Sequence, residues 1–316
     1  MVGSIATRAA YGAALVELAK THPELLVLDA DLSQAVNTGK FAQAYPERHF
    51  DMGIAEGNMT GVAAGLATCG KHPFINTFAV FATGRAWEQV RNSIAYPGLP
   101  VTVVGSHGGL SVGEDGATHQ CNEDLNNMRV LPGMTVVVPC DGHEMTLATE
   151  ALLNLNGPSY LRLGRMAVDN VTDGMPGYKF ELGKGVTMRD GGDVTVIACG
   201  LMVQESLKAA DILAAEGISV RVIDMHTIKP LDEALVLQAA KETGAIVTSE
   251  EHSIVGGLGA AVCEYLSQAC PVPVVRHGVE DCFGRSGPAK KVLAAYGLTA
   301  EGLAEKVRLA VSLKNR

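Results

Sequence analysis

The chain has 316 residues, of which 25 are basic and 34 acidic, so its formal net charge is −9. This acidic balance argues against binding to nucleic acid or to an anionic membrane surface. A hydrophobic content of 47% is typical of a globular protein with a large core, and the length predicts two domains. The seven cysteines form no C-x-x-C pair, and no run approaches about 18 apolar residues. We therefore expect free thiols in a reducing compartment and a cytoplasmic protein.

Apolar, strand-like runs alternate with amphipathic stretches through the first half of the chain. The expected strands are 25–32, 73–78, 100–107, 134–140 and 158–165, and the expected helices are 8–22, 56–70, 84–96, 119–131 and 142–155. Continuous apolar strands joined by helices predict a parallel sheet that is covered on both faces. We expect this first domain to span residues 1–170.

The alternation breaks at 166–186, a stretch rich in Gly, Asp and Pro that predicts an interdomain connection, with the linker proper at 171–188. A second unit follows over 189–316. Its expected strands are 193–200, 218–228, 244–251 and 271–278, and its expected helices are 202–216, 231–243, 256–269 and 288–314, the last one broken near Gly297. The sequence thus predicts an α/β fold of two domains, each a mostly parallel sheet covered by helices on both faces.

Polar and aromatic side chains gather where the expected strands of the first domain end. They are Asp31, Phe78, His107, Asp115, His119 and Arg165, while Glu56 opens the helix 56–70. In open parallel sheets, ligands bind beyond the carboxyl ends of the strands. We therefore expect a single site at this edge, with the glycine-rich stretch "GEDGATHQ" (113–120) as part of it.

Several interpretations of this loop remain open from the residues alone. His107, Asp115 and His119 have the chemistry of metal ligands, but their spacing matches no standard site. A serine nucleophile beside a histidine would need a motif such as G-x-S-x-G, which is missing. A pocket that hydrogen-bonds a phosphorylated or polyhydroxylated ligand and moves its protons suits two histidines. A solvated loop whose glycines only make turns stays an alternative.

Each candidate also has a purely structural interpretation. Glu56 could be a first-turn acid that the helix dipole favours, and phenylalanines are more often core residues than cofactor contacts. Arg8 and Arg165 could form surface ion pairs. For His226 and His252 a structural role is the favoured interpretation.

Six segments together resemble the transketolase family. "GIAEGNMTGVAAGLA", "NTFAVFATGRAWEQVRNSI", "VGSHGGLSVGEDGATHQCNEDL" and "PSYLRLGR" resemble, in order, its pyrimidine-binding domain. "EEHSIVGGLGAAV" and "FGRSGPAKKVLAAYGLTAEGL" resemble its C-terminal domain. The resemblance runs over almost the whole chain and implies thiamine diphosphate as cofactor. It implies transfer of a two-carbon ketol unit between sugar phosphates, either in the pentose phosphate pathway or in the catabolism of unusual sugars.

The resemblance assigns cofactor contacts to four residues. Glu56 would hydrogen-bond N1′ of the aminopyrimidine and promote its tautomerisation, a task that suits a buried carboxyl with a raised pKa. Phe81 would stack on the pyrimidine ring, with Phe78 beside it. Asp31, in "DADL", matches an acid near the family's site.

The resemblance assigns substrate contacts to five further residues. Asp115 would bind the ketose hydroxyl next to the reacting carbon, and His107 and His119 would contact hydroxyl and carbonyl oxygens. With Glu56, these histidines form the expected catalytic set. Arg8 and Arg165 would hold the substrate phosphate, for which the planar guanidinium is well suited.

The sequence also departs from the family pattern. Ser33 and Thr38 both lie near the place of a family serine that contacts phosphate, but neither aligns cleanly. Arg85 lies near the place of a common tyrosine, and Gly57 replaces a larger polar residue.

The chain has no G-D-G motif, which in thiamine enzymes holds Mg²⁺ and diphosphate. The resemblance therefore implies the C-terminal half of a split enzyme, with an N-terminal subunit that binds Mg²⁺ and diphosphate in an α2β2 assembly. Three alternatives remain: a deoxyxylulose-phosphate synthase, which usually carries arginine in place of His107, a β subunit of a 2-oxo-acid dehydrogenase, and a non-catalytic regulatory subunit.

Overall fold

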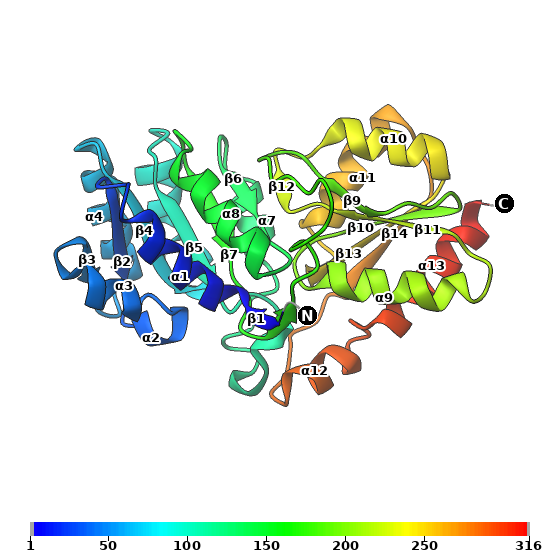
Figure 1. Ribbon diagram of the computed structural model, residues 1–316, viewed down its shortest axis with the longest axis horizontal. Helices are drawn as coiled ribbons and strands as arrows, with labels where there is room; N and C mark the ends of the chain where they lie inside the picture. Colours follow the sequence, from blue (N-terminus) through cyan, green and yellow to red (C-terminus); the bar gives the residue numbers. More distant parts are fainter. Residues whose placement is uncertain (1–2, 315–316) are drawn as a thin grey trace.

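The computed structural model describes residues 3–314, and the expected domain ends at residues 1–2 and 315–316 lie outside them. The described chain forms two α/β units side by side, the first coloured blue to green and the second green to red (Figure 1). Each unit has a mostly parallel sheet with helices on both faces, which confirms the expected fold class. No helix within 3–314 has the length and apolar character that a membrane crossing requires.

The first sheet has the strand order β12-β6-β7-β5-β4-β2-β3. Its strands from the first half are β2 (Leu25–Asp29), β3 (His49–Asp51), β4 (His72–Phe78), β5 (Thr102–Ser106), β6 (Thr135–Val137) and β7 (Ser159–Arg162). These strands are parallel to one another. One face packs on α1 (Thr7–Leu18) and α8 (Gly142–Leu153), and the other on α4 (Glu56–Thr68) and α7 (Asp124–Arg129).

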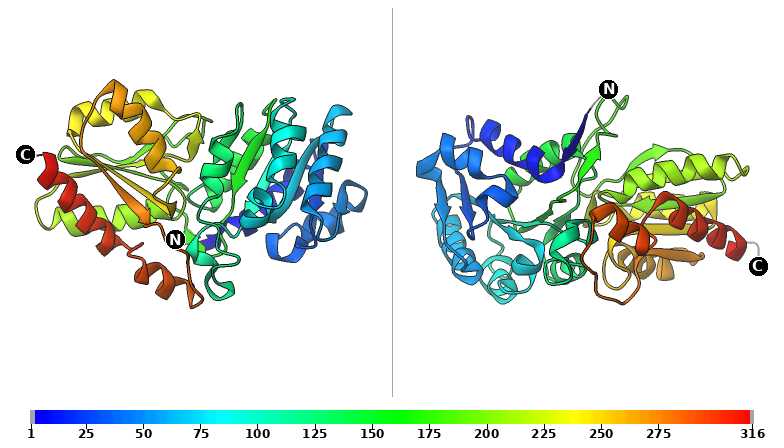
Figure 2. Two further views of the ribbon diagram at one scale, coloured as in Figure 1. Left: turned by 180° about the vertical axis from the view of Figure 1, so that it is seen from behind. Right: turned by 90° about the horizontal axis from the view of Figure 1, so that it is seen from below.

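The second sheet has the strand order β14-β13-β10-β11-β9. Its members are β9 (Val186–Arg189), β10 (Val194–Ala198), β11 (Val220–Asp224), β13 (Ile246–Ser253) and β14 (Val274–Val279), and β9 alone among them runs antiparallel. The helices α9 (Met202–Ala214) and α13 (Ala300–Lys314) cover one face, and α10 (Glu233–Thr243) and α11 (Leu258–Ala269) cover the other (Figure 2).

One expected strand, 218–228, is wrong as a single element. After β11 the chain leaves the second sheet, and β12 (Thr227–Lys229) pairs antiparallel with β6 of the first sheet. Both segments contain buried aliphatic residues, so periodicity alone cannot show which sheet each one joins. The linker region also contributes strand structure, because β9 begins at Val186 and β8 (Ala167–Asp169) pairs with β1 (Ser4–Ala6).

Shorter elements connect the main ones. They are α2 (Ser33–Val36), α3 (Gly39–Ala44), α5 (Ala79–Thr83), α6 (Trp87–Gln89), a π-helical turn at Val90–Ala95, α12 (Ala289–Ala295), and 3₁₀ turns at Pro46–Arg48 and Leu110–Asp115. The expected helix 119–131 begins only at Asp124, because residues 119–123 are part of the loop after β5. The expected break near Gly297 is confirmed, since this residue has a φ of 72° between α12 and α13.

Candidate active site

The carboxyl of Glu56 lies at the start of α4 and is almost fully buried, with 4% of the residue exposed. Its Oε1 accepts a bond of 3.0 Å from Nη1 of Arg85, whose side chain is half exposed. The same guanidinium lies 4.0 Å from the centre of the Phe81 ring. The buried Glu56 carboxyl and the Phe81 ring thus both contact the planar, half-exposed guanidinium of Arg85.

Two phenylalanines and two histidines form a cluster beside this pair. Phe78 ends β4 and Phe81 lies in α5, and their rings are nearly parallel at 5.9 Å. His107, directly after β5, has its ring 4.0 Å from that of Phe78, and the ring of His119 lies 5.6 Å from that of Phe81. The structure therefore brings these four predicted residues into contact from separate elements.

His107 lies in a constrained and buried position. Its φ of 59° places a non-glycine residue in the left-handed region, and only 3% of it is exposed. Its Nδ1 lies 2.8 Å from Oγ of Ser106. Burial, with the charges of Arg8 and Arg165, lowers the pKa of His107 to about 3. The imidazole is therefore neutral at physiological pH.

Arg8 and Arg165 come from α1 and from the segment after β7, and their charges act on each other. Burial and the charge of Arg165 lower the pKa of Arg8, and its Nη1 donates to the Ala35 carbonyl at 2.6 Å. Arg165 forms an ion pair of 2.9 Å with Glu114 and donates to a loop carbonyl. Asp115, next to Glu114, is exposed.

Asp31 and Thr38 lie in the segment after β2. Asp31 is exposed with a φ of 57°, and its amide donates to Asp51, which also accepts the Gly53 amide in the segment before α4. The Thr38 hydroxyl is buried and donates to Asp29 at 2.6 Å. Because this hydroxyl is already bound to an internal carboxylate, Thr38 is a weak candidate for a phosphate contact.

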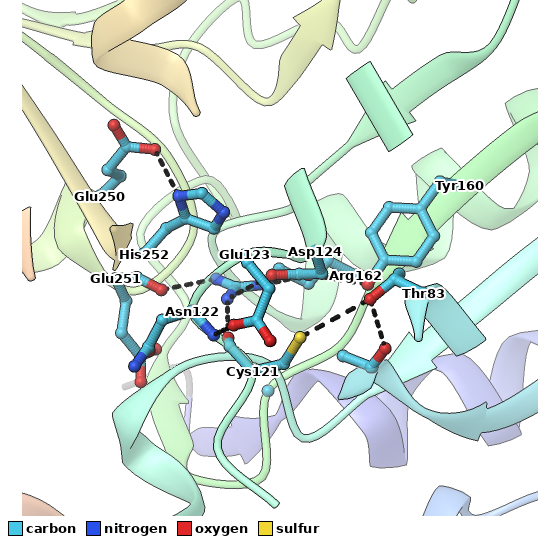
Figure 3. Close-up of polar contacts among 12 residues, drawn as sticks. Thr83, Cys121, Asn122, Glu123, Asp124, Tyr160, Arg162, Glu250, Glu251 and His252 are labelled. Carbon is cyan, nitrogen blue, oxygen red and sulfur yellow. Dashed lines mark hydrogen bonds and ion pairs between the residues drawn. The ribbon is translucent and has the colours of Figure 1, made fainter. Parts of the chain in front are cut away.

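Sequence reasoning missed a buried network that joins the two domains (Figure 3). Arg162 donates twice to Asp124, at 2.8 and 3.1 Å, and Tyr160 donates to the same carboxylate at 2.7 Å. Arg162 also donates to the main-chain carbonyls of Cys121 and Glu251, at 3.1 and 2.9 Å. Arginine in an otherwise apolar strand was the available signal, since a buried guanidinium requires partners.

The loop after β5 also contacts the second domain. We call residues 107–122 the β5 loop. The Ser111 amide donates to the Glu251 carboxylate, and the Gln120 side chain donates to the Arg285 carbonyl at 3.0 Å. Burial raises the pKa of Glu251 to about 7, although Arg162 and the Ser111 amide favour its charged form.

The metal alternative for His107, Asp115 and His119 finds no support. Within residues 3–314, the group with ligand atoms close enough for an ion is Cys140, Glu144 and Asp224, all buried. Burial and the neighbouring Glu144 raise the pKa of Asp224 well above its ordinary value.

His226 and His252 lie inside the protein. His226 stacks on Phe180 with 4.2 Å between the ring centres, and Nδ1 of His252 lies 2.7 Å from the Ser253 carbonyl oxygen. Both are fully buried, as the structural interpretation requires. The seven cysteines are free.

Comparison with known proteins places this geometry in a family. Residues 3–170 match the transketolase pyrimidine-binding domain, and residues 183–303 match the transketolase C-terminal domain. A subunit of a 6-deoxy-6-sulfo-D-fructose transketolase from Clostridium sp. (strain MSTE9) is 44% identical, over 98% of this chain and 95% of its own length. One of the subunits of an apulose-4-phosphate transketolase from Phocaeicola vulgatus is 40% identical, over 95% of both chains.

A solved structure described as a split-gene transketolase in an inactive β4 tetramer is also similar. It is 50% identical and has a TM-score of 0.89, and the match covers 99% of this chain and 100% of that one. The chain therefore belongs to the transketolase family, and it corresponds to the pyrimidine-binding and C-terminal domains of that family.

Proposed function

We propose that this chain is the C-terminal subunit of a split transketolase, which transfers a two-carbon ketol (glycolaldehyde) unit from a ketose phosphate to an aldose phosphate. The observation that carries the proposal is that the buried Glu56 carboxyl and the Phe81 ring face share one planar neighbour, the half-exposed guanidinium of Arg85. Relatives of the same length are named as subunits of transketolases, which supports the division of the enzyme between two chains.

The residues around Glu56 fit the aminopyrimidine of thiamine diphosphate. The Arg85 guanidinium supports this fit, because it is planar, donates to Glu56 and stacks on Phe81. An aminopyrimidine ring can make the same two contacts. When bound, thiamine diphosphate supplies the electron sink for carbon–carbon bond cleavage. We assign Mg²⁺ and the diphosphate to a partner subunit, since the sequence has no G-D-G motif.

Five of the predicted site residues have definable tasks in this reaction. Glu56 would hold a proton at N1′ of the ring, which a carboxyl shielded from water does best. Neutral His107 can donate one hydrogen bond and accept another, and its Nδ1 is already in contact with Ser106. His119 lies across the same aromatic cluster. Arg8 and Arg165 would neutralise the phosphate of the sugar.

The surface around Glu56 supports the need for a partner. Ile54, two residues before Glu56, is 72% exposed, and Phe50 and Val62 are about 40% exposed. Gly61 and Gly65 on α4 have open space where a side chain would lie. An apolar helix face with such small residues allows close packing of another chain. We infer that the N-terminal subunit, in an α2β2 assembly, covers this face.

The test is ketol transfer by this chain mixed with a diphosphate-binding N-terminal subunit. Glu56→Gln should lower kcat by about 10²–10⁴-fold, the usual size of a lost proton-transfer group. Glu233→Gln is the matched control, because Glu233 is also the first residue of a helix, α10, but is exposed. Near-normal turnover by Glu56→Gln would refute the proposal.

A deoxyxylulose-phosphate synthase activity is an alternative that can be distinguished from ketol transfer by the substrates used. Such an enzyme from Syntrophotalea carbinolica is 37% identical, although this chain covers only 47% of it. The reconstituted pair should use a ketose phosphate with an aldose phosphate, and not pyruvate with glyceraldehyde 3-phosphate. The reverse preference would favour the synthase. No turnover that depends on the partner would favour a regulatory subunit.

A further inference from the structure

We propose that Glu251, in the C-terminal domain, is a positioning residue that holds the β5 loop in place for the sugar. This inference rests on the proposed function for the identity of the ligand. It assigns to the C-terminal domain a part in substrate binding, although that domain contributes none of the predicted site residues. The proposal stands on three features of the contact between Glu251 and the loop.

The first feature is that Glu251 is linked to both ends of the loop. Its carboxylate accepts the amide of Ser111, near the start. Its main-chain carbonyl accepts Nη1 of Arg162, and Nη2 of the same guanidinium donates to the Cys121 carbonyl, near the end. The amide of Gly109 donates to that carbonyl too, at 2.8 Å, so the loop closes on itself at this point. The Glu251 carboxylate thus holds the start of the loop. Arg162 joins the Glu251 carbonyl to the Cys121 carbonyl at the end of the loop (Figure 3).

The second feature is how closely the loop approaches the carboxylate. A side chain at Gly109 would place its Cβ 2.4 Å from the Glu251 carboxyl carbon, and the φ of Gly109 is 80°. Only glycine permits both this backbone conformation and this distance. Further along, a Cβ at Gly116 would lie 2.3 Å from the Ser286 hydroxyl. The loop is therefore shaped to lie against the C-terminal domain.

The third feature is what the loop carries. His107 begins it, and Asp115 and His119 lie within it. Arg165 bonds to the loop through its ion pair with Glu114. A shift at Ser111 would move groups that we assign to the sugar, and an error of about 1 Å in such groups can cost about 10²-fold in rate. Glu251 itself is buried, so it acts through the loop.

The neighbouring Glu250 provides a matched control. It is on the same strand and only 1% exposed, and its carboxylate accepts two amides at 2.8 Å, from Leu258 and Gly259 at the start of α11. These contacts stay within the C-terminal domain. Loss of Glu250 should therefore weaken that domain without a specific effect on the loop.

The experiment uses the full-length chain and its Glu251→Ala, Glu251→Gln and Glu250→Gln variants. Hydrogen exchange of the free subunit reports on segment 108–116, and steady-state kinetics with the N-terminal subunit give KM for the ketose phosphate. We expect Glu251→Ala to speed exchange of this segment and raise KM at least about tenfold, with a smaller change in kcat. Glu251→Gln keeps an oxygen for the Ser111 amide and should restore most of both properties. Glu250→Gln should leave both nearly unchanged.

Two results would overturn the proposal. One is slow loop exchange and an unchanged KM in Glu251→Ala. The other is a Glu250→Gln variant that matches Glu251→Ala in both measurements, which would show a general loss of structure. If Glu251→Ala does not fold, fast exchange of the Ser111 amide in the wild-type subunit would contradict the contact. Exchange needs neither cofactor nor sugar, so a protected loop in a chain without ketol transfer would refute the proposed function alone.

Discussion

Two charged clusters of this molecule differ in how far the chain completes them. In the interdomain network, Arg162 and Asp124 are buried, and the arginine has four hydrogen bonds to three partners. In the other cluster, Glu56 is buried but its partner Arg85 is half exposed, with apolar residues uncovered nearby. The first cluster is finished by the chain itself. The second has the features of a site that another molecule must complete.

The difference has a physical basis in the cost of burying charge. A buried ion pair is tolerated only when its remaining donors and acceptors are also satisfied, as they are around Arg162. A half-exposed arginine keeps contact with water, so it can leave its partner at less cost than a buried arginine, provided that another group takes its place beside the buried carboxyl. Rigid and exchangeable charge pairs thus coexist in one domain, and each can be tested separately.

Removal of Arg162 should give the largest effect on stability. Arg162→Leu would leave Asp124 buried without its cation, and loss of one partner of a buried pair costs about 3–5 kcal/mol. Burial acts to lower the pKa of Arg162, but the charges of Asp124 and Glu251 outweigh it and raise the pKa overall. Urea unfolding of the free subunit measures the change.

The control for this prediction is Arg308→Leu. Arg308 also makes two hydrogen bonds to one carboxylate, that of Glu216, but both side chains are about 40% exposed. Its loss should lower the free energy of unfolding far less than the loss of Arg162, because water screens an exposed ion pair. If both variants lose the same free energy of unfolding, the buried network around Arg162 is no more important for stability than an exposed ion pair.

A charge on the apolar face beside Glu56 should have the second largest effect. Ile54→Asp should weaken association with the N-terminal subunit about tenfold or more, since an apolar contact would be replaced by a desolvated charge. The free subunit should keep its stability within about 0.5 kcal/mol, because Ile54 is exposed there.

Leu309→Asp serves as the comparison for Ile54→Asp. Leu309 is 45% exposed and belongs to α13. This helix, red in Figure 2, lies at the outer edge of the second domain. Leu309→Asp should not affect association with the N-terminal subunit, which sedimentation or calorimetry can measure. If both variants assemble normally, the face around Ile54 is not the partner surface.

The sequence predicted the two sheets and the start of α4 well, because apolar runs and small-residue helices have local signals. It could not predict that β12 joins the first sheet, since pairing partners are set by packing between segments far apart in the chain. It also placed the start of α7 too early. Residues 119–123 are held as loop by contacts with the second domain, such as the bond from Ser253 to Asn122.

For the site, the resemblance identified residues that the structure does bring together, such as Phe81, His107 and His119. Their roles stay predictions. Glu251 escaped notice because its importance depends on a contact with Ser111, 140 positions away, and no local pattern encodes that contact. Arg85 was noted only as a departure, although it is the direct partner of Glu56.

A smaller effect is expected from Arg85. The Glu56 carboxyl and the Phe81 face are both occupied by its guanidinium, so a bound pyrimidine would have to displace it. Arg85→Met should therefore tighten thiamine diphosphate binding to the reconstituted pair by up to about tenfold, the combined value of an exposed ion pair and a cation–π contact. Cofactor titration by calorimetry gives the affinity. Weaker binding by Arg85→Met would show instead that Arg85 contacts the cofactor.

The smallest expected effect concerns His107, which lies between the two clusters and shares the burial of the first. Its pKa of about 3 in the folded chain is below the ordinary value of 6.5, so below pH 6.5 the unfolded chain binds a proton that the folded chain does not. Stability is therefore lost as pH falls, by about 0.7 kcal/mol for this group between pH 7 and pH 6. His107→Gln should remove this increment from the difference between unfolding free energies at the two pH values.

The same argument applies to catalysis by His107. A neutral imidazole that stays neutral contributes no limb to the pH profile of kcat/KM between pH 5 and pH 9, so His107→Gln should lower the rate without changing the shape of the profile. A limb near pH 6.5 that disappears in the variant would show that His107 is hydrated and titrates normally. It would then belong with Glu56 and Arg85, among the groups whose surroundings are completed only by another molecule.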